Sequence, residues 1–122
     1  MALLAQLIDD VVVHKFEISG SEMTIGRRPN CDIVIDDSAV SGQHAKLVAQ
    51  PNPFFESYLE VYLEDLGSTN GTFVLDLPVK GKTRLHDGDI VRIGLNTFKF
   101  IDDTEQEMER TVHLIRTQQS QQ

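Results

Sequence analysis

Three polar loops hold the residues of this sequence that suit the capture of a phosphate group. Each loop contains glycine, and together they supply one well-placed arginine, Arg27, and two hydroxyl side chains, Ser41 and Thr69. A phosphomonoester carries about −1.5 to −2 charges and three strong acceptor oxygens. An arginine fork meets two of these oxygens at once, and hydroxyl and loop N–H groups add neutral donors. The residues therefore predict a phosphate receptor, if the fold brings the loops together.

Catalysis is a weaker interpretation of the same residues. Ser41 and His44 could suggest a hydrolase pair, but no third member is suitably placed, and we expect no catalytic residue and no enzyme. The order of residues 67–71 is wrong for a nucleophile elbow, and no lysine follows as in a P-loop. The four histidines lack metal-ligand spacing, and Cys31 is the single cysteine, so we expect neither a metal nor a cofactor.

The charge of the chain limits its partners. At a formal net charge of −8, the chain repels nucleic-acid backbones and anionic membranes, so we expect neither as a partner. A local arginine still outweighs distant carboxylates, which salt screens beyond roughly 10 Å. Residues 1–8 lack the basic start of a signal peptide, and no apolar run approaches the ~20 residues that span a bilayer. With one cysteine, the chain suits a reducing, cytoplasmic location.

The elements that must position these loops are short strands. Apolar, β-branched runs alternate with turn signals such as Asn70-Gly71, and no helical pattern separates them, which indicates an all-β sandwich or barrel. The predicted strands are Val11–Ile18, Met23–Ile25, Ile33–Ile35, Ala45–Val48, Tyr58–Glu64, Thr72–Val74, Asp89–Ile93 and Thr97–Ile101.

The C-terminal segment differs in character. Thr104 and Glu107 have the spacing of a capping box, and Met108, Val112 and Ile115 recur at helical spacing. We therefore predict one domain over residues 1–102, followed over 103–122 by a short helical segment and a disordered tail.

Four motifs in register identify a family. Gly26-Arg27, Ser41-x-x-His44, residues 68–72 (Ser-Thr-Asn-Gly-Thr) and residues 85–94 (Leu-x-x-Gly-Asp-x-Val-x-Ile-Gly) occur in the order and spacing typical of the forkhead-associated (FHA) domain. The resemblance runs from about Met23 to Ile101. It implies a two-sheet sandwich of about eleven short strands with the three loops at one end.

The resemblance also implies roles. Arg27 and Ser41 would contact the phosphate of a phosphothreonine peptide, Thr69 would donate a further hydroxyl, and Asn70 would bind the peptide main chain. Three further residues would be structural. Gly26 would allow the turn that aims Arg27, His44 would be buried and brace the loops, and Gly71 would complete the third loop. The function implied is a phosphothreonine-binding adaptor in Ser/Thr-kinase signalling.

Two departures from the family pattern concern peptide selectivity. Gly42 stands where many relatives carry a side chain that reaches the peptide, and Ala39 cannot make a charged contact that some relatives make. Specificity would then be looser, or contacts beyond the phosphate would rely on Arg28 or another loop. The expected phosphopeptide-binding residues are therefore Arg27, Ser41, Thr69, Asn70, Arg28 and Gly42. An alternative function is a phospho-independent interaction scaffold on the same fold. If Thr111 were phosphorylated, the tail could also mediate self-association.

Overall fold

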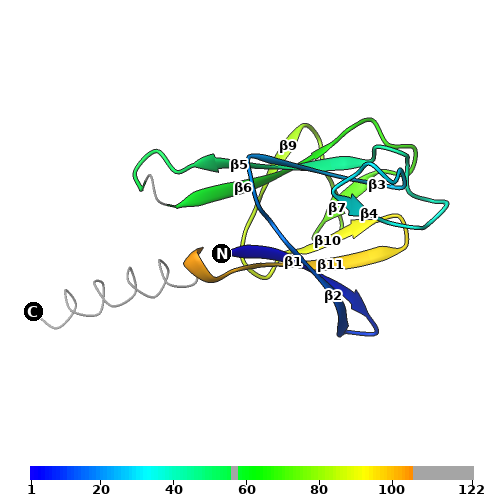
Figure 1. Cartoon of the computed structure of the whole chain (residues 1–122), viewed down its shortest axis with the longest axis horizontal. Coiled ribbons are helices and arrows are strands. Elements are labelled where there is room, and N and C mark those ends of the chain that lie inside the picture. Colours follow the sequence, from blue (N-terminus) through cyan, green and yellow to red (C-terminus); the bar gives the residue numbers. More distant parts are fainter. Residues whose placement is uncertain (56–57, 106–122) are drawn as a thin grey trace, which may run out of the picture.

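Two β-sheets packed face to face make up the part of the chain that the computed structural model describes, residues 1–55 and 58–105 (Figure 1). The six-stranded sheet has the order β2-β1-β11-β10-β7-β8, and the five-stranded sheet has the order β4-β3-β5-β6-β9. The all-β, two-sheet sandwich of about eleven strands is thus confirmed. The strands are β1 (Ala2–Ile8), β2 (Val11–Glu17), β3 (Glu22–Gly26), β4 (Ile33–Val34), β5 (Ala45–Pro51), β6 (Leu59–Asp65), β7 (Thr72–Val74), β8 (Leu77–Pro78), β9 (Lys82–Leu85), β10 (Ile90–Ile93) and β11 (Asn96–Asp102).

Short turns explain why most neighbouring strands are antiparallel. The hairpin between β10 and β11 turns on Gly94, whose φ of +61° favours glycine, and it brings Ile93 opposite Asn96. Strands β3 and β4 are the exception, because they pair in parallel with Ile25 opposite Ile33. The polar loop between these two strands therefore has to double back at one end of the sandwich.

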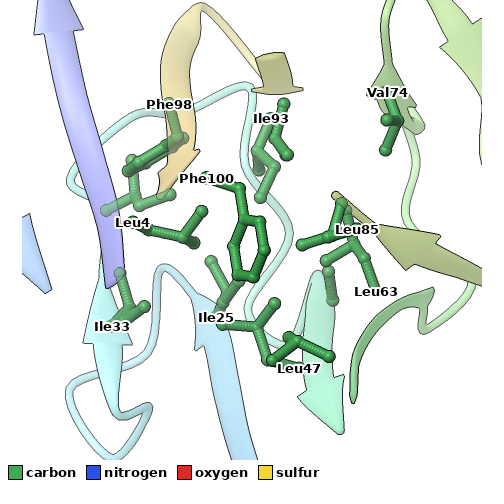
Figure 2. Close-up of a cluster of buried hydrophobic side chains, with 14 of the residues drawn as sticks. Leu4, Ile25, Ile33, Leu47, Leu63, Val74, Leu85, Ile93, Phe98 and Phe100 are labelled. Carbon is green, nitrogen blue, oxygen red and sulfur yellow. The ribbon is translucent and has the colours of Figure 1, made fainter. Parts of the chain in front are cut away.

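The hydrophobic core lies between the two sheets and anchors the strands that carry the loops. Phe100 lies at the centre of the cluster in Figure 2, with Leu4, Ile25 and Leu63 among the buried side chains around it. Phe98 is also buried, with 1% of its surface exposed. Burial of each such side chain stabilises the fold by roughly 1.5–3 kcal/mol. Both sheets contribute to one cluster, so the loops project from a single rigid body.

The strand β1 is one that the sequence pattern does not predict. It lies between β2 and β11, with Leu4 opposite Phe100. Its apolar residues do not alternate with polar ones as in a strand that is buried on one face only. Leu4 faces the core, and Leu3 and Leu7 on the opposite face of the sheet are also partly buried. An apolar run at the start of a chain therefore forms a central strand here.

Residues 103–105 are helical, so the helical conformation starts one residue before the predicted Thr104. The Asp102 carboxylate accepts N–H groups from Thr104 and Glu105 at 3.0 and 3.3 Å, so Asp102 rather than Thr104 caps the first turn. The remainder of the predicted helix, the tail and Thr111 lie outside the described residues. Within the described ranges, no helix has the length and apolar character to cross a membrane.

Candidate functional site

The three polar loops predicted to act together meet at one end of the sandwich. They are the β3–β4 loop (residues 27–32), the β4–β5 loop (residues 35–44) and the β6–β7 loop (residues 66–71). This end lies away from the N-terminus (Figure 1). The fourth motif divides between the two ends, because Gly88 lies in the distant β9–β10 turn whereas Gly94 lies beside the β4–β5 loop.

Backbone hydrogen bonds join the first loop to the second. The N–H of Arg27 donates to the Ser41 carbonyl at 3.0 Å, and the N–H of Arg28 donates to the Gly42 carbonyl at 3.1 Å. Gly26 makes this approach possible, since a Cβ there would lie 2.2 Å from the Gly42 oxygen. The family resemblance implies that Gly26 allows the turn that aims Arg27. The structure adds that the close packing of two backbones requires a glycine at this position.

His44 joins the second loop to the third. Its ring is fully buried, and Nδ1 accepts the Ser41 N–H at 3.0 Å. Nε2 must therefore carry the ring hydrogen, which it donates to the Gly71 carbonyl at 2.9 Å. The Leu66 N–H in turn donates to the His44 carbonyl. Both ring nitrogens are engaged by backbone groups, so the imidazole positions Ser41 and is not aimed at its hydroxyl.

Asp65 organises the third loop. Its carboxylate accepts N–H groups from Gly67 and Ser68 at 3.0 and 3.1 Å, and hydroxyls from Ser68 and Thr72 at 2.6 and 2.7 Å. Burial alone would raise the pKa of Asp65, but these four donors together lower it below the usual value. The ionised carboxylate thus fixes the shape of the loop that presents Thr69 and Asn70.

The tip of the third loop is held against the second. The Thr69 N–H donates to the Ser41 hydroxyl oxygen at 3.1 Å, and the Asn70 amide nitrogen donates to the Ala39 carbonyl at 2.8 Å. Because Ser41 Oγ already accepts a hydrogen bond, its own hydrogen is available to donate to a ligand. Thr69 itself is exposed.

Two arginines border this cluster. Arg27 and Arg28 are exposed, and neither makes an ion pair within the described part of the chain. The Arg28 side chain lies across Gly42, where a Cβ would be 2.7 Å from Nε. The Arg28 side chain from the neighbouring loop therefore occupies the space that a side chain at Gly42 would fill.

Asp37 is a supporting residue whose importance the sequence does not reveal. Its carboxylate accepts the N–H of Ala39, and it reaches the Leu95 N–H and the Asn96 amide in the β10–β11 turn at 3.0 and 2.9 Å. The hydrogen bond from Ala39, followed by that from Leu95, lowers the pKa of Asp37. In the sequence, Asp37 is recognisable as an aspartate at the start of a turn, which predicts loop formation but no contact with a distant turn.

Buried Cys31 adds one further contact at the base of the cluster, where its thiol donates to the Gly42 carbonyl at 3.3 Å. Among the residues that the structure describes, no group of three or more His, Cys, Asp and Glu side chains could hold a metal ion. The exposed arginine side chains and the hydroxyls of the cluster have the chemistry to bind an anion.

Comparison with known proteins places this arrangement among relatives. The FHA domain family model matches residues 23–94. Human kanadaptin is 36% identical over 108 residues, covering 80% of this chain and 15% of kanadaptin. The glycogen accumulation regulator GarA of Mycobacterium tuberculosis is 34% identical over 92 residues, covering 75% of this chain and 52% of GarA. The chain thus spans about half, or less, of the length of these relatives.

A solved structure with a similar fold is also informative. It comes from a structural and functional analysis of phosphothreonine-dependent FHA domain interactions, with a TM-score of 0.70 and 27% sequence identity. The similarity covers 83% of this chain and 95% of that one. Nearly the whole described fold is thus shared with a domain studied for phosphothreonine-dependent interactions.

Proposed function

The chain belongs to the FHA family, and from this premise we propose that its three-loop end binds a phosphothreonine peptide through Arg27, Ser41, Thr69 and Asn70. An FHA domain is a non-catalytic binding module, and this chain is homologous to phosphothreonine-binding modules. We assign the phosphate contacts to Arg27, Ser41 and Thr69, and the contact with the peptide main chain to Asn70.

The observation that carries the proposal is the hydrogen bonding of Ser41. Its backbone N–H is taken by His44, and its Oγ accepts from the Thr69 N–H. The hydroxyl hydrogen is left to donate to a ligand. Arg27, whose backbone N–H donates to the Ser41 carbonyl, is exposed and makes no ion pair in the described ranges. A fixed hydroxyl donor and an exposed cation on the adjoining loop suit an oxyanion better than any uncharged group.

The strength of such a site is adequate for signalling. Each charge-assisted hydrogen bond contributes roughly 1.5–3 kcal/mol net. Three or four of them, from Arg27, Ser41 and Thr69, contribute roughly 5–12 kcal/mol, which brackets the about −8 kcal/mol of a micromolar complex before the costs of ordering are subtracted. Asn70 uses one amide hydrogen on Ala39, so its carbonyl oxygen and second hydrogen can bind a peptide main chain.

We assign Arg28 a secondary role in the same site. It lies over Gly42 at the edge of the cluster, so it can reach a phosphate oxygen or an acidic side chain that flanks the phosphothreonine. The lack of a side chain at Gly42 is what makes room for it. We further propose that the ligand is a substrate of a Ser/Thr kinase and that binding takes place in the cytoplasm.

Calorimetric titration tests the proposal with one peptide, selected from an oriented phosphothreonine library, in phosphothreonine, phosphoserine and unphosphorylated forms. The phosphothreonine form should bind most tightly and the unphosphorylated form not measurably. Arg27→Ala should weaken binding by roughly 10- to 150-fold, equivalent to 1.5–3 kcal/mol. Lys99→Ala, which removes an exposed cation far from the loops, is the matched control. Equal binding of phosphorylated and unphosphorylated peptides would disprove the proposal.

A further inference from the structure

The outer face of the six-stranded sheet is unusually apolar for a surface. In Figure 1 this sheet forms the lower layer, and its outer side faces away from the five-stranded sheet. Antiparallel sheets commonly place polar side chains on the solvent side. Here the register aligns Leu3 with Ile101, and Lys99 with both Ala5 and Ile90, so β1, β10 and β11 all contribute apolar residues to that face.

These apolar residues are separate from the core. Leu3, Leu7 and Ile90 are partly exposed and do not belong to the core cluster. Ala5 also lies outside that cluster, and it is fully buried. It pairs with Lys15 on one side and Lys99 on the other, so it lies on the outer face with these two lysines. The outer face therefore has its own apolar surface.

That surface continues to the edge of the sheet. Val12 lies opposite Leu7 across the β1–β2 pair. Val11, Val12 and Val13 on the edge strand β2 are exposed by 62, 44 and 46%.

The charges in the middle of this face are all positive. Lys15 and Lys99 lie on either side of Ala5, about 10 Å apart across two strand spacings. Arg92 is diagonal to Lys99 and lies over the Phe73 ring, 4.5 Å from its centroid. Throughout the described chain none of these three cations forms an ion pair.

The nearest carboxylates in register lie at the margins of the face. Glu17 lies opposite Leu3, and Asp9 and Asp10 form the β1–β2 turn. On a chain of net charge −8, a central row of unpaired cations among apolar side chains is a distinct feature.

We infer that this face, defined by Leu3, Leu7, Lys15, Arg92 and Lys99, docks an acidic amphipathic segment of another protein, independently of phosphorylation. Carboxylates of the segment would pair with the three cations, and its apolar side chains would cover the leucines. A second copy of the chain is disfavoured because two such faces repel each other. An anionic membrane is disfavoured because the chain as a whole carries a net charge of −8.

Synthetic unphosphorylated peptides that combine Glu with Leu and Val test this inference by ¹⁵N NMR titration of the full chain. Matched peptides replace Glu with Lys, Glu with Gln, or the apolar residues with Ser. Only the acidic apolar peptides should bind, and they should shift the amides of Leu3, Leu7, Thr97 and Lys99 but not that of Ser41.

Two charge-matched double variants separate this face from the phosphopeptide site. Lys15→Glu/Lys99→Glu should weaken binding of the acidic apolar peptide at least tenfold and leave phosphopeptide binding intact. Arg27→Glu/Arg28→Glu should have the opposite pattern. The inference would be overturned if the Lys or Gln peptides bound equally well, or if the shifts were confined to the loop end. It would also be overturned if the chain self-associated, or bound anionic vesicles, in a way that the Lys15→Glu/Lys99→Glu variant abolishes. The phosphopeptide proposal would be unaffected by any of these outcomes.

Discussion

The two ends of the sandwich both use aspartates to fix their turns, but they treat charge differently. At the loop end, four donors lower the pKa of Asp65 although burial opposes them. At the far end, burial raises the pKa of Asp102, and the N–H groups of Glu105 and Thr104 only partly offset it. Buried Glu105 accepts from the Asp87 N–H nearby and contacts His86 Nδ1 at 2.8 Å, so carboxylates gather there.

This difference indicates how the loop end of an acidic chain would bind an anion, as we propose. The loop-end carboxylates of Asp37 and Asp65 accept hydrogen bonds from nearby turns. The exposed Arg27 and Arg28, by contrast, have no carboxylate partners in the described residues. The far end offers buried carboxylates instead. Net charge therefore says less about ligand sign than the local pairing of each charge does.

Removal of the buried imidazole should have the largest effect on stability. His44→Ala leaves the Ser41 N–H and the Gly71 carbonyl without partners and creates a cavity, so the free energy of unfolding should fall by roughly 2–5 kcal/mol. Chemical denaturation measures this. His14→Ala, which removes an exposed histidine on β2, is the control and should change stability by less than about 0.5 kcal/mol. Similar losses in the two variants would contradict the role assigned to His44.

A second pair of variants distinguishes the two glycines of the site. Gly26→Ala places a Cβ against the Gly42 backbone and should cost about 1–3 kcal/mol of stability. Gly42→Ala meets only the flexible Arg28 side chain, so stability should change little while phosphopeptide affinity falls. Thermal melts and titrations on both variants check this. An unchanged melting temperature in Gly26→Ala would show that the first two loops are not packed as described.

Amide replacements at the two ends should differ in their effect on stability at neutral pH. Asp65→Asn loses carboxylate acceptors for four donors and should destabilise the fold by roughly 1–2 kcal/mol. Asp102→Asn keeps an acceptor for the cap and removes a buried charge, so stability should stay equal or rise.

The pH dependence should follow the same signs. The stability that Asp65 contributes is complete above its unfolded pKa of about 3.9 and is lost as pH falls through its lower folded value. For Asp102, whose folded pKa is raised, the contribution is present below the unfolded pKa and is lost as pH rises through the folded one. Melting temperatures between pH 3 and 7 for the two variants measure both effects. Parallel curves in wild type and Asp65→Asn would contradict the first.

The sequence predicted the fold class because turn residues and alternating strands are local features. It did not predict β1, since an apolar run with both faces partly covered has no strand periodicity. The loops could be grouped only through family resemblance, because contacts such as that between Thr69 and Ser41 join residues far apart in the chain. The distant link from Asp37 to Leu95 and the packing of Arg28 over Gly42 depend on three-dimensional proximity, which no spacing encodes.

The most direct test of the central claim is a ¹⁵N NMR titration with a phosphothreonine peptide, read at both ends of the sandwich. We predict shifts at the amides of Arg27, Ser41 and Thr69 and none at Gly88 or Glu105. Shifts centred on the far end, or equal shifts with the unphosphorylated peptide, would contradict the account.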